Sequence, residues 1–247
     1  QWAENNYFGK PCGLMDQMAC SVGNLIHIDF ASTENPKVEK VMIDFNHYGY
    51  SLCITDTKGS HADLTDEYAA IPGEMKKVAA VFGKDVLLGI TTDDILKKID
   101  EIRELAGDRG VLRALHFIRE NERVKKEVSC LSDEDIDGFF RTVAESGNSS
   151  YKYLQNVYSN SNVQQQNVSI ALAVSEYVLG KAGAWRVHGG GFAGTIQAFV
   201  KNDKVKEYKA AMNNIFGEER RFICSRLLQQ NFKYWLIPLI SRYFAIL

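Results

Sequence analysis

Residues 186–195 read Arg-Val-His-Gly-Gly-Gly-Phe-Ala-Gly-Thr, with four glycines in six positions between two short runs of β-forming residues. These runs, Ala184–His188 and Gly194–Val200, predict two strands joined by a glycine-rich turn. Glycine adopts positive φ angles readily and lets the backbone approach a neighbour closely. The spacing is neither GxGxxG nor GxxxxGK[ST], so the residues alone leave both a tight hairpin and a generic phosphate loop open.

Outward from this stretch, short β-forming runs alternate with longer segments of helical period. The spacing from Ser132 to Asp135 is typical of a helix capping box, and Pro72 is expected to kink or restart its helix. The predicted strands are 25–30, 41–45 and 50–56, the last two joined by a turn at 47–49, and the predicted helices are 64–82, 92–105, 110–128, 132–146, 163–180 and 204–216. With no internal repeat or Gly/Ser linker, this pattern predicts a closely knit α+β fold.

The composition is that of an ordinary globular protein, with 45% hydrophobic and 24% charged residues among 247. The net charge of −2 gives no basic surface for nucleic acid or for anionic lipid. A small-molecule partner is therefore the expectation, with no nucleic acid, no membrane and no obligate protein partner indicated.

The cysteines and histidines lack the spacings of disulfide frameworks and metal sites. The five cysteines contain no CxxC pair and the five histidines no HxxxH pair, which favours a reducing cytoplasm and no metal ligands. The chain begins at Gln1 without a signal-like segment, and a truncated start is expected. Residues 232–247 are strongly apolar but are interrupted by Lys233, Pro238 and Arg242, so they do not predict a membrane span.

A second motif, GKPCGLMDQ, occupies residues 9–17 and brings the chain to a predicted helix start with Asp16 in its first turn. Carboxylates are stabilised there by the helix dipole and by free backbone amides. From spacing alone, a structural acid is the preferred interpretation of Asp16.

Both motifs resemble galactokinases of the GHMP kinase superfamily. GxxCGxMDQ is similar to the segment that carries the family's catalytic aspartate, and RVHGGGFAGTIQAFV is similar to its third conserved motif. Residues 55–68, 113–124 and 146–157 also resemble galactokinase stretches, so that the similarity covers about 5–217. The resemblance implies a C-terminal GHMP lobe with an antiparallel sheet and packed helices at 46–217, a remnant of the N-terminal lobe at 1–45, and a divergent or frameshifted tail at 218–247.

The resemblance also implies the site residues. Asp16 would be catalytic, and Gly13, Asp16 and Tyr68 would contact the sugar. The glycines of the third motif, Gly189, Gly190, Gly191 and Gly194, would shape the site rather than grip nucleotide. For the other resembling stretches a structural interpretation is preferred: Arg113, His116, Glu120 and Arg123 as a solvated helix face, and Ser149, Ser150 and Asn156 as helix caps.

Two departures from the family qualify this prediction. No segment resembles the family's sugar-binding GRxNLIGEH or phosphate-binding PxGxGLSSSA patterns. ATP and Mg²⁺ are therefore expected to bind mainly to a missing N-terminal lobe, and the isolated chain to be inactive. From Glu219 onward the family's GEGxCYxLxIRPxGG strand is absent, so an unpaired sheet edge is expected there.

The implied reaction is ATP-dependent phosphorylation of α-D-galactose at its anomeric C1 hydroxyl, giving galactose 1-phosphate. Two alternatives stay open. One is a kinase for a related sugar such as N-acetylgalactosamine or arabinose, and the other is a galactokinase-like sensor that binds sugar and ATP without turnover.

Overall fold

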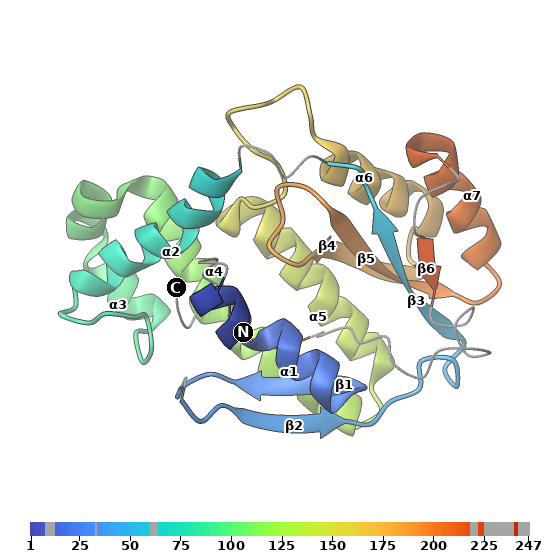
Figure 1. Cartoon of the computed structure of the whole chain (residues 1–247), viewed down its shortest axis with the longest axis horizontal. Helices are drawn as coiled ribbons and strands as arrows, with labels where there is room; N and C mark the ends of the chain where they lie inside the picture. The colour runs from blue at the N-terminus through green and yellow to red at the C-terminus, as the bar shows by residue number, and fades with distance from the viewer. Residues whose placement is uncertain (8–12, 33, 60–63, 218–221, 225–239, 242–247) are drawn as a thin grey trace. The chain divides into compact units, whose positions relative to one another are not determined.

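The computed structural model describes residues 1–7, 13–32, 34–59, 64–217, 222–224 and 240–241 (Figure 1). The strands are β1 Leu25–Asp29, β2 Lys37–Val41, β3 Tyr50–Asp56, β4 Gly183–His188, β5 Thr195–Lys201, β6 Phe222–Cys224 and β7 Ile240–Ser241. The α-helices are α1 Met15–Val22, α2 Thr65–Ala80, α3 Thr92–Lys97, α4 Ile99–Ser132, α5 Ile136–Ser149, α6 Asn167–Leu179 and α7 Val205–Phe216, and single π-helical turns occur at η1 Ala3–Tyr7 and η2 Ser150–Leu154.

The chain divides into two compact units. Unit 1 comprises Gln1–Ile43, Pro72–Glu134 and Phe232–Leu247, and unit 2 comprises Asp44–Ile71 and Asp135–Asn231. Helix α2 contributes its first half to unit 2 and its second half to unit 1. The domain ranges proposed from the sequence stay a prediction.

Unit 2 is built on an antiparallel sheet of order β4-β5-β3-β6. Strand β5 is buried from its second to its sixth residue, because helices cover both faces of the sheet. Ile196, Ala198 and Val200 pack with residues of α6 and α7 on one face. Figure 1 shows these two helices beside the sheet. On the other face Phe199 meets Phe139 of α5, with ring centroids 5.3 Å apart. The predicted α+β fold with an antiparallel sheet and packed helices is confirmed.

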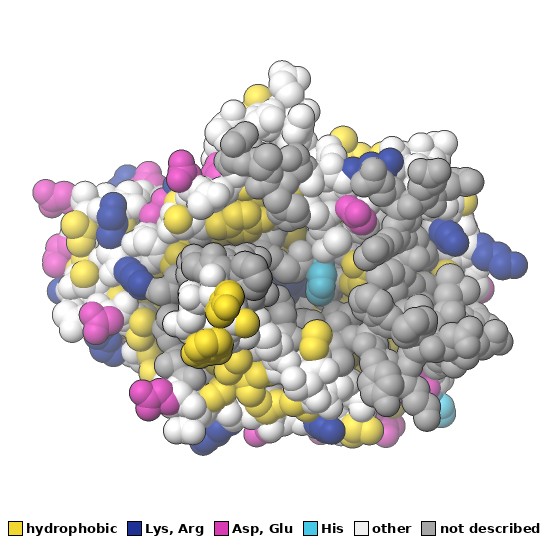
Figure 2. Space-filling model, viewed as in Figure 1, with side chains coloured by type: hydrophobic (Ala, Val, Ile, Leu, Met, Phe, Trp, Pro, Cys, Tyr) yellow, Lys and Arg dark blue, Asp and Glu magenta, His cyan; other side chains and the backbone are white. Residues whose placement is uncertain are grey.

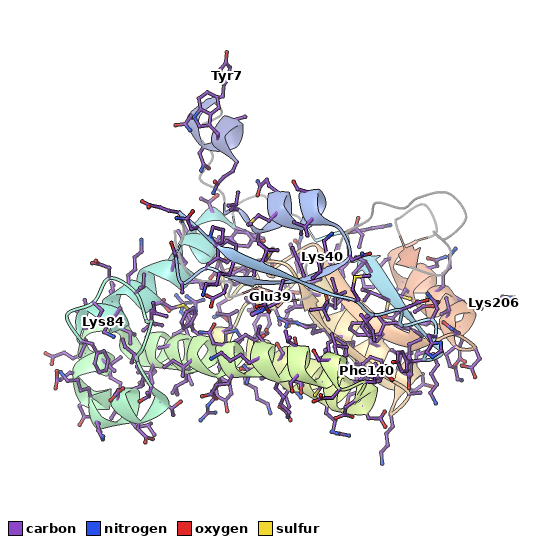
Figure 3. The ribbon with its side chains drawn as sticks, turned by 90° about the horizontal axis from the view of Figure 1, so that it is seen from below. Tyr7, Glu39, Lys40, Lys84, Phe140 and Lys206 are labelled. Atoms are coloured by element: carbon purple, nitrogen blue, oxygen red, sulfur yellow. The ribbon has the colours of Figure 1, made fainter. Side chains whose placement is uncertain are left out.

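Unit 1 contains a second sheet of order β2-β1-β7, in which β1 pairs antiparallel with β2 and parallel with β7. The apolar residues of α1 recur at helical spacing and pack on β1, where Ile26 and Ile28 are fully buried. Figure 3 shows Glu39 and Lys40 on β2, beside α1 and β1. Glu39 lies opposite His27, whose Nδ1 is 3.2 Å from its carboxylate.

Several local predictions are wrong. Residues 41–45 are not a strand, since β2 ends at Val41 and a turn begins at Phe45. The Phe45 ring packs against Phe139 and Phe199. The helix predicted at 132–146 begins later than expected, because Asp135 rather than Ser132 provides the cap and accepts a hydrogen bond from the Gly138 amide. Helix α2 continues through Pro72, so the expected restart is wrong, whereas a kink there stays a prediction.

The helical middle follows the sequence more closely. The predicted gap between 105 and 110 corresponds to a kink in α4 at Gly107, where φ is 72° and ψ is 173°. Most of the tail, 218–247, lies outside the described residues. Its β6 segment pairs with β3 in the register Cys53↔Cys224, so the expected open edge is paired over three residues.

Candidate functional site

The glycine-rich stretch forms the turn between β4 and β5, which we call the glycine turn (Gly189–Gly194). Its backbone is left-handed at Gly189, Gly191 and Gly194, with φ angles of 77°, 85° and 89°, and also at Phe192 with 58°. Residues other than glycine rarely adopt such backbone angles. The glycine-rich sequence and the geometry of the turn therefore agree. The two flanking strands pair from Gly183↔Val200 to His188↔Thr195 and bring both ends of the turn together.

Three consecutive residues of the glycine turn are held by two residues from distant segments, Asn156 and Tyr68. Asn156 Nδ2 donates to the Gly190 carbonyl at 3.1 Å, and Tyr68 Oη donates to the Gly191 carbonyl at 2.8 Å. The Phe192 amide in turn donates to the Asn156 backbone carbonyl at 2.5 Å. The conformation of the turn is therefore set by tertiary contacts and not by its own sequence alone.

The same two neighbours explain why small residues are needed. A Cβ atom at Gly191 would collide with the backbone carbonyl oxygen of Asn156. A Cβ atom at Gly190 would lie 2.9 Å from Cε1 of Tyr68. These glycines permit close approach of protein groups, which favours the interpretation that they shape the site.

Thr57, just beyond β3, holds the far end of the turn. Its amide and its hydroxyl both donate to the Gly194 carbonyl at 2.7 Å. Asn167 Nδ2, at the start of α6, donates to the Thr57 carbonyl at 2.9 Å. The glycine turn is thus joined to both the sheet and the helix layer of unit 2.

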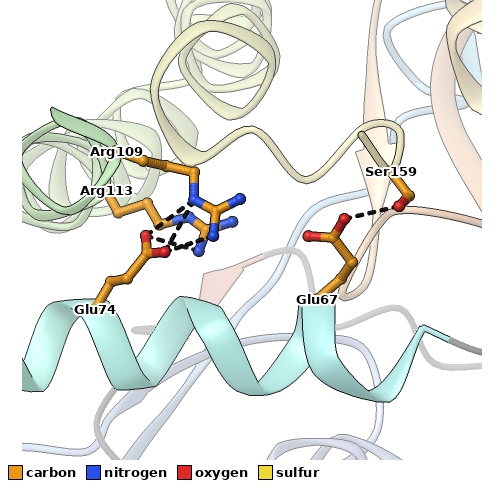
Figure 4. A network of polar contacts seen from close by, with 5 residues as sticks. All are labelled: Glu67, Glu74, Arg109, Arg113 and Ser159. Atoms are coloured by element: carbon orange, nitrogen blue, oxygen red, sulfur yellow. Dashed lines mark hydrogen bonds and ion pairs between the residues drawn. The ribbon is translucent and has the colours of Figure 1, made fainter. Parts of the chain in front are cut away.

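Tyr68 lies in the first half of α2 with its ring half-buried against the glycine turn. The ring meets Phe192 edge-on, with centroids 5.3 Å apart and an interplanar angle of 89°. Burial raises the pKa of the Tyr68 phenol above its ordinary value, so the hydroxyl stays neutral and can both donate and accept hydrogen bonds. Figure 4 shows the neighbouring Glu67, whose carboxylate accepts a hydrogen bond of 2.7 Å from Ser159.

The predicted catalytic residue, Asp16, is the second residue of α1, and Gly13 is an exposed residue just before that helix. The Asp16 side chain and residues 9–12 of the motif lie outside the described part of the chain. Asp16 and Gly13 belong to unit 1, whereas Tyr68 and the glycine turn belong to unit 2. Their assembly into one sugar site therefore stays a prediction.

The expectation that Arg113 and His116 belong to a solvated face of α4 is wrong. Arg113 is 0% exposed and His116 is 3% exposed. Arg113 Nη1 lies 2.9 Å from Glu74 Oε2, and Arg109 Nε lies 2.9 Å from Glu74 Oε1, as Figure 4 shows. The charged Arg113 side chain can be buried in the protein because the Glu74 carboxylate of α2 pairs with it.

Asn156 is the functional candidate that sequence reasoning missed, since it holds the glycine turn and caps no helix. It is 3% exposed and follows a left-handed Gln155 that ends η2. In the structure it follows the π-helical turn η2, an element of a kind that often marks functional segments. Nothing in the local sequence indicates its partner 34 residues away.

Two consecutive amides of the glycine turn are already used by protein carbonyls. The Phe192 amide is used by Asn156, and the Ala193 amide donates to Gly191 at 2.7 Å. Phosphate loops instead point successive amides at the ligand. Among the side chains that the structure describes, no group of three or more His, Cys, Asp or Glu residues could hold a metal ion.

Two surface features complete the description. On the face in Figure 2, positive and negative side chains are interspersed over the described residues. None of the helices in the described ranges is long and apolar enough to cross a membrane.

Comparison with known proteins gives consistent results, although no family model matches the chain. A galactokinase of Thermotoga neapolitana is 29% identical over 216 residues, which cover 87% of this chain and 57% of that protein. A galactokinase of Glaesserella parasuis serovar 5 is 26% identical over 206 residues, covering 83% of this chain and 51% of that protein.

Among solved structures, Lactococcus lactis galactokinase complexed with galactose superposes with a TM-score of 0.68 at 21% identity. The superposition covers 91% of this chain and 56% of that one. The chain spans about half the length of the curated relatives that it matches. The chain is thus similar to galactokinases in sequence and in fold over most of its own length.

Proposed function

We propose that this chain is part of a galactokinase, which transfers a phosphoryl group from ATP to the anomeric C1 hydroxyl of α-D-galactose. The observation that carries this proposal is the similarity to curated galactokinases over 83% to 87% of the chain. The galactose complex of the L. lactis protein, which shares the fold, supports a sugar as the acceptor.

In this proposal Asp16 acts on the attacking hydroxyl. Phosphoryl transfer proceeds through a loose transition state, so the protein contributes mainly in-line positioning and charge stabilisation. A carboxylate with an ordinary pKa near 3.9 is a weak base for a sugar hydroxyl. Asp16 would orient the C1 hydroxyl and accept its proton late, as the new oxygen–phosphorus bond forms and ADP leaves.

Tyr68 and Gly13 are proposed to contact the sugar. The Tyr68 proton is used on the Gly191 carbonyl, so a sugar hydroxyl would donate to its oxygen. Gly13 would offer backbone close to the sugar. ATP and Mg²⁺ would be bound mainly by a further lobe, since no segment of this chain resembles the family's phosphate-binding PxGxGLSSSA pattern.

Two alternatives follow from the same similarity. The acceptor could be N-acetylgalactosamine or arabinose, or the protein could bind sugar and ATP as a sensor without turnover. Retention of Asp16 favours an enzyme over a sensor.

The test is to join this chain to the upstream half of a galactokinase and to measure sugar-dependent ADP release. Galactose should be the best substrate in a panel with N-acetylgalactosamine and arabinose, and the 247-residue chain alone should be inactive. Sugar and ATP binding without ADP release would favour the sensor. Turnover by the isolated chain would refute the assignment of the ATP site to a further lobe.

A further inference from the structure

The glycine turn is held at one position by the side chain of Asn156, which the resemblance assigns no role. Asn156 Nδ2 donates to Gly190, and the Asn156 backbone carbonyl accepts from Phe192. One residue thus binds the turn on both sides of Gly191. We propose that Asn156 is a positioning residue that sets the glycine turn and, through it, the orientation of Tyr68.

The orientation of the Asn156 amide follows from its partner. Nδ2 must face the Gly190 carbonyl, because an oxygen in its place would repel that acceptor. The other amide atom, Oδ1, is buried and has no hydrogen-bond partner among the described residues. A buried carbonyl without a partner destabilises a fold by about 1–3 kcal/mol, so this side chain is poorly explained by stability alone.

The connection to Tyr68 is direct. Phe192, whose amide is held by Asn156, packs its ring edge-on against Tyr68, and Gly191 accepts the Tyr68 hydroxyl proton. If the turn moves, both the ring contact and the hydroxyl partner move. Asn156 would therefore affect a ligand of Tyr68 without touching that ligand.

The discriminating variant is Asn156→Leu, which keeps the branched shape but removes the donor and the unpartnered oxygen. The substitution takes the donor away from the Gly190 carbonyl, but it also removes the buried, unpartnered Oδ1, so its two effects on global stability oppose one another. A purely structural role predicts a change in global stability with the turn and Tyr68 unmoved, whereas a positioning role predicts local loosening of the turn. Asn160→Leu, at an exposed position in the same segment, is the matched control.

The first measurement uses the 247-residue chain and needs no activity. Amide hydrogen exchange at Phe192 and Ala193 should accelerate about 10-fold in Asn156→Leu, and the Tyr68 ring resonances should shift, with global unfolding and the control unchanged. Should Asn156→Leu fail to fold, Asn156→Ser, which loses the same amide donor, decides the question. Unchanged exchange in a folded variant would overturn the proposal.

The second measurement rests on the proposed function and uses the joined enzyme. Asn156→Leu should raise KM for galactose about 3- to 10-fold, the equivalent of one weakened hydrogen bond, with kcat within about 2-fold. A selective loss of kcat would contradict action through Tyr68. If the joined enzyme with Asn156 intact phosphorylates no sugar, the proposed function fails, while the exchange measurement still decides the role of Asn156.

Discussion

The Arg113 guanidinium, fully buried in α4, forms an ion pair with the Glu74 carboxylate of α2, with 2.9 Å between Nη1 and Oε2. Glu74 also accepts hydrogen bonds from Arg109, so one carboxylate pairs with two guanidinium groups. Buried charges persist only when they are paired and hydrogen-bonded. The fold therefore depends on the Glu74 carboxylate as a counterion for Arg113.

Replacing Glu74 with Gln should lower the free energy of unfolding by about 3 kcal/mol, because Arg113 would keep its charge without this counterion. Urea unfolding of the chain measures the change. Glu101→Gln, which breaks an exposed pair with Lys98, is the control and should have little effect. Equal effects of the two substitutions would mean that burial of the Arg113–Glu74 pair does not add to the free energy of unfolding that is lost.

Gly191→Ala should destabilise unit 2 more than Gly189→Ala does. Both positions have positive φ, so both variants incur the left-handed penalty of roughly 1–2 kcal/mol. Only at Gly191 would the added methyl group also collide with Asn156, which adds about 1–3 kcal/mol. Thermal unfolding of the two variants side by side tests the difference, and equal melting temperatures would argue against the close approach of Asn156.

Because of Tyr208, the free energy of unfolding should fall as the pH rises into the alkaline range. Burial raises the pKa of its phenol, which lies 2.8 Å from Ser175 Oγ. A raised folded-state pKa means that this stability is fully present below the ordinary value near 10 and is lost as pH rises above it. Between about pH 9 and about pH 11, Tyr208→Phe should lose less unfolding free energy than the unchanged chain. Tyr177→Phe, at a 90% exposed position, should show no such difference.

Tyr68→Phe should raise KM for galactose in the joined enzyme. The lost hydroxyl removes a hydrogen bond worth about 0.5–1.5 kcal/mol and leaves the Gly191 carbonyl without this donor. Steady-state kinetics measures KM and kcat, with Tyr177→Phe again as control. An unchanged KM would limit Tyr68 to a structural role.

Asp16→Asn should lower kcat of the joined enzyme by roughly 100-fold or more, while galactose binding falls less. The reason is that an orienting and proton-accepting carboxylate acts mainly in the transition state. Ser21→Ala, on the same helix, should leave kcat unchanged. Near-normal kcat in Asp16→Asn would exclude a catalytic role for Asp16.

The sequence by itself determined the features that depend on neighbours along the chain. Alternating β-formers around 186–200 indicated β4, β5 and the glycine turn, and helical period indicated α6 and α7 to within a few residues. Motif similarity pointed to Asp16 as a catalytic candidate. Local propensity and spacing suffice for such features because both are properties of a short segment.

Only the tertiary structure decided what distant segments do to one another. Strand β3 pairs with β5 across more than a hundred residues, Arg113 is buried because Glu74 faces it, and Gly191 must be a glycine because Asn156 approaches its Cα. Those contacts depend on which surfaces meet after the chain collapses. A local pattern contains no record of them, since the same charged or polar residue suits either solvent or a buried partner.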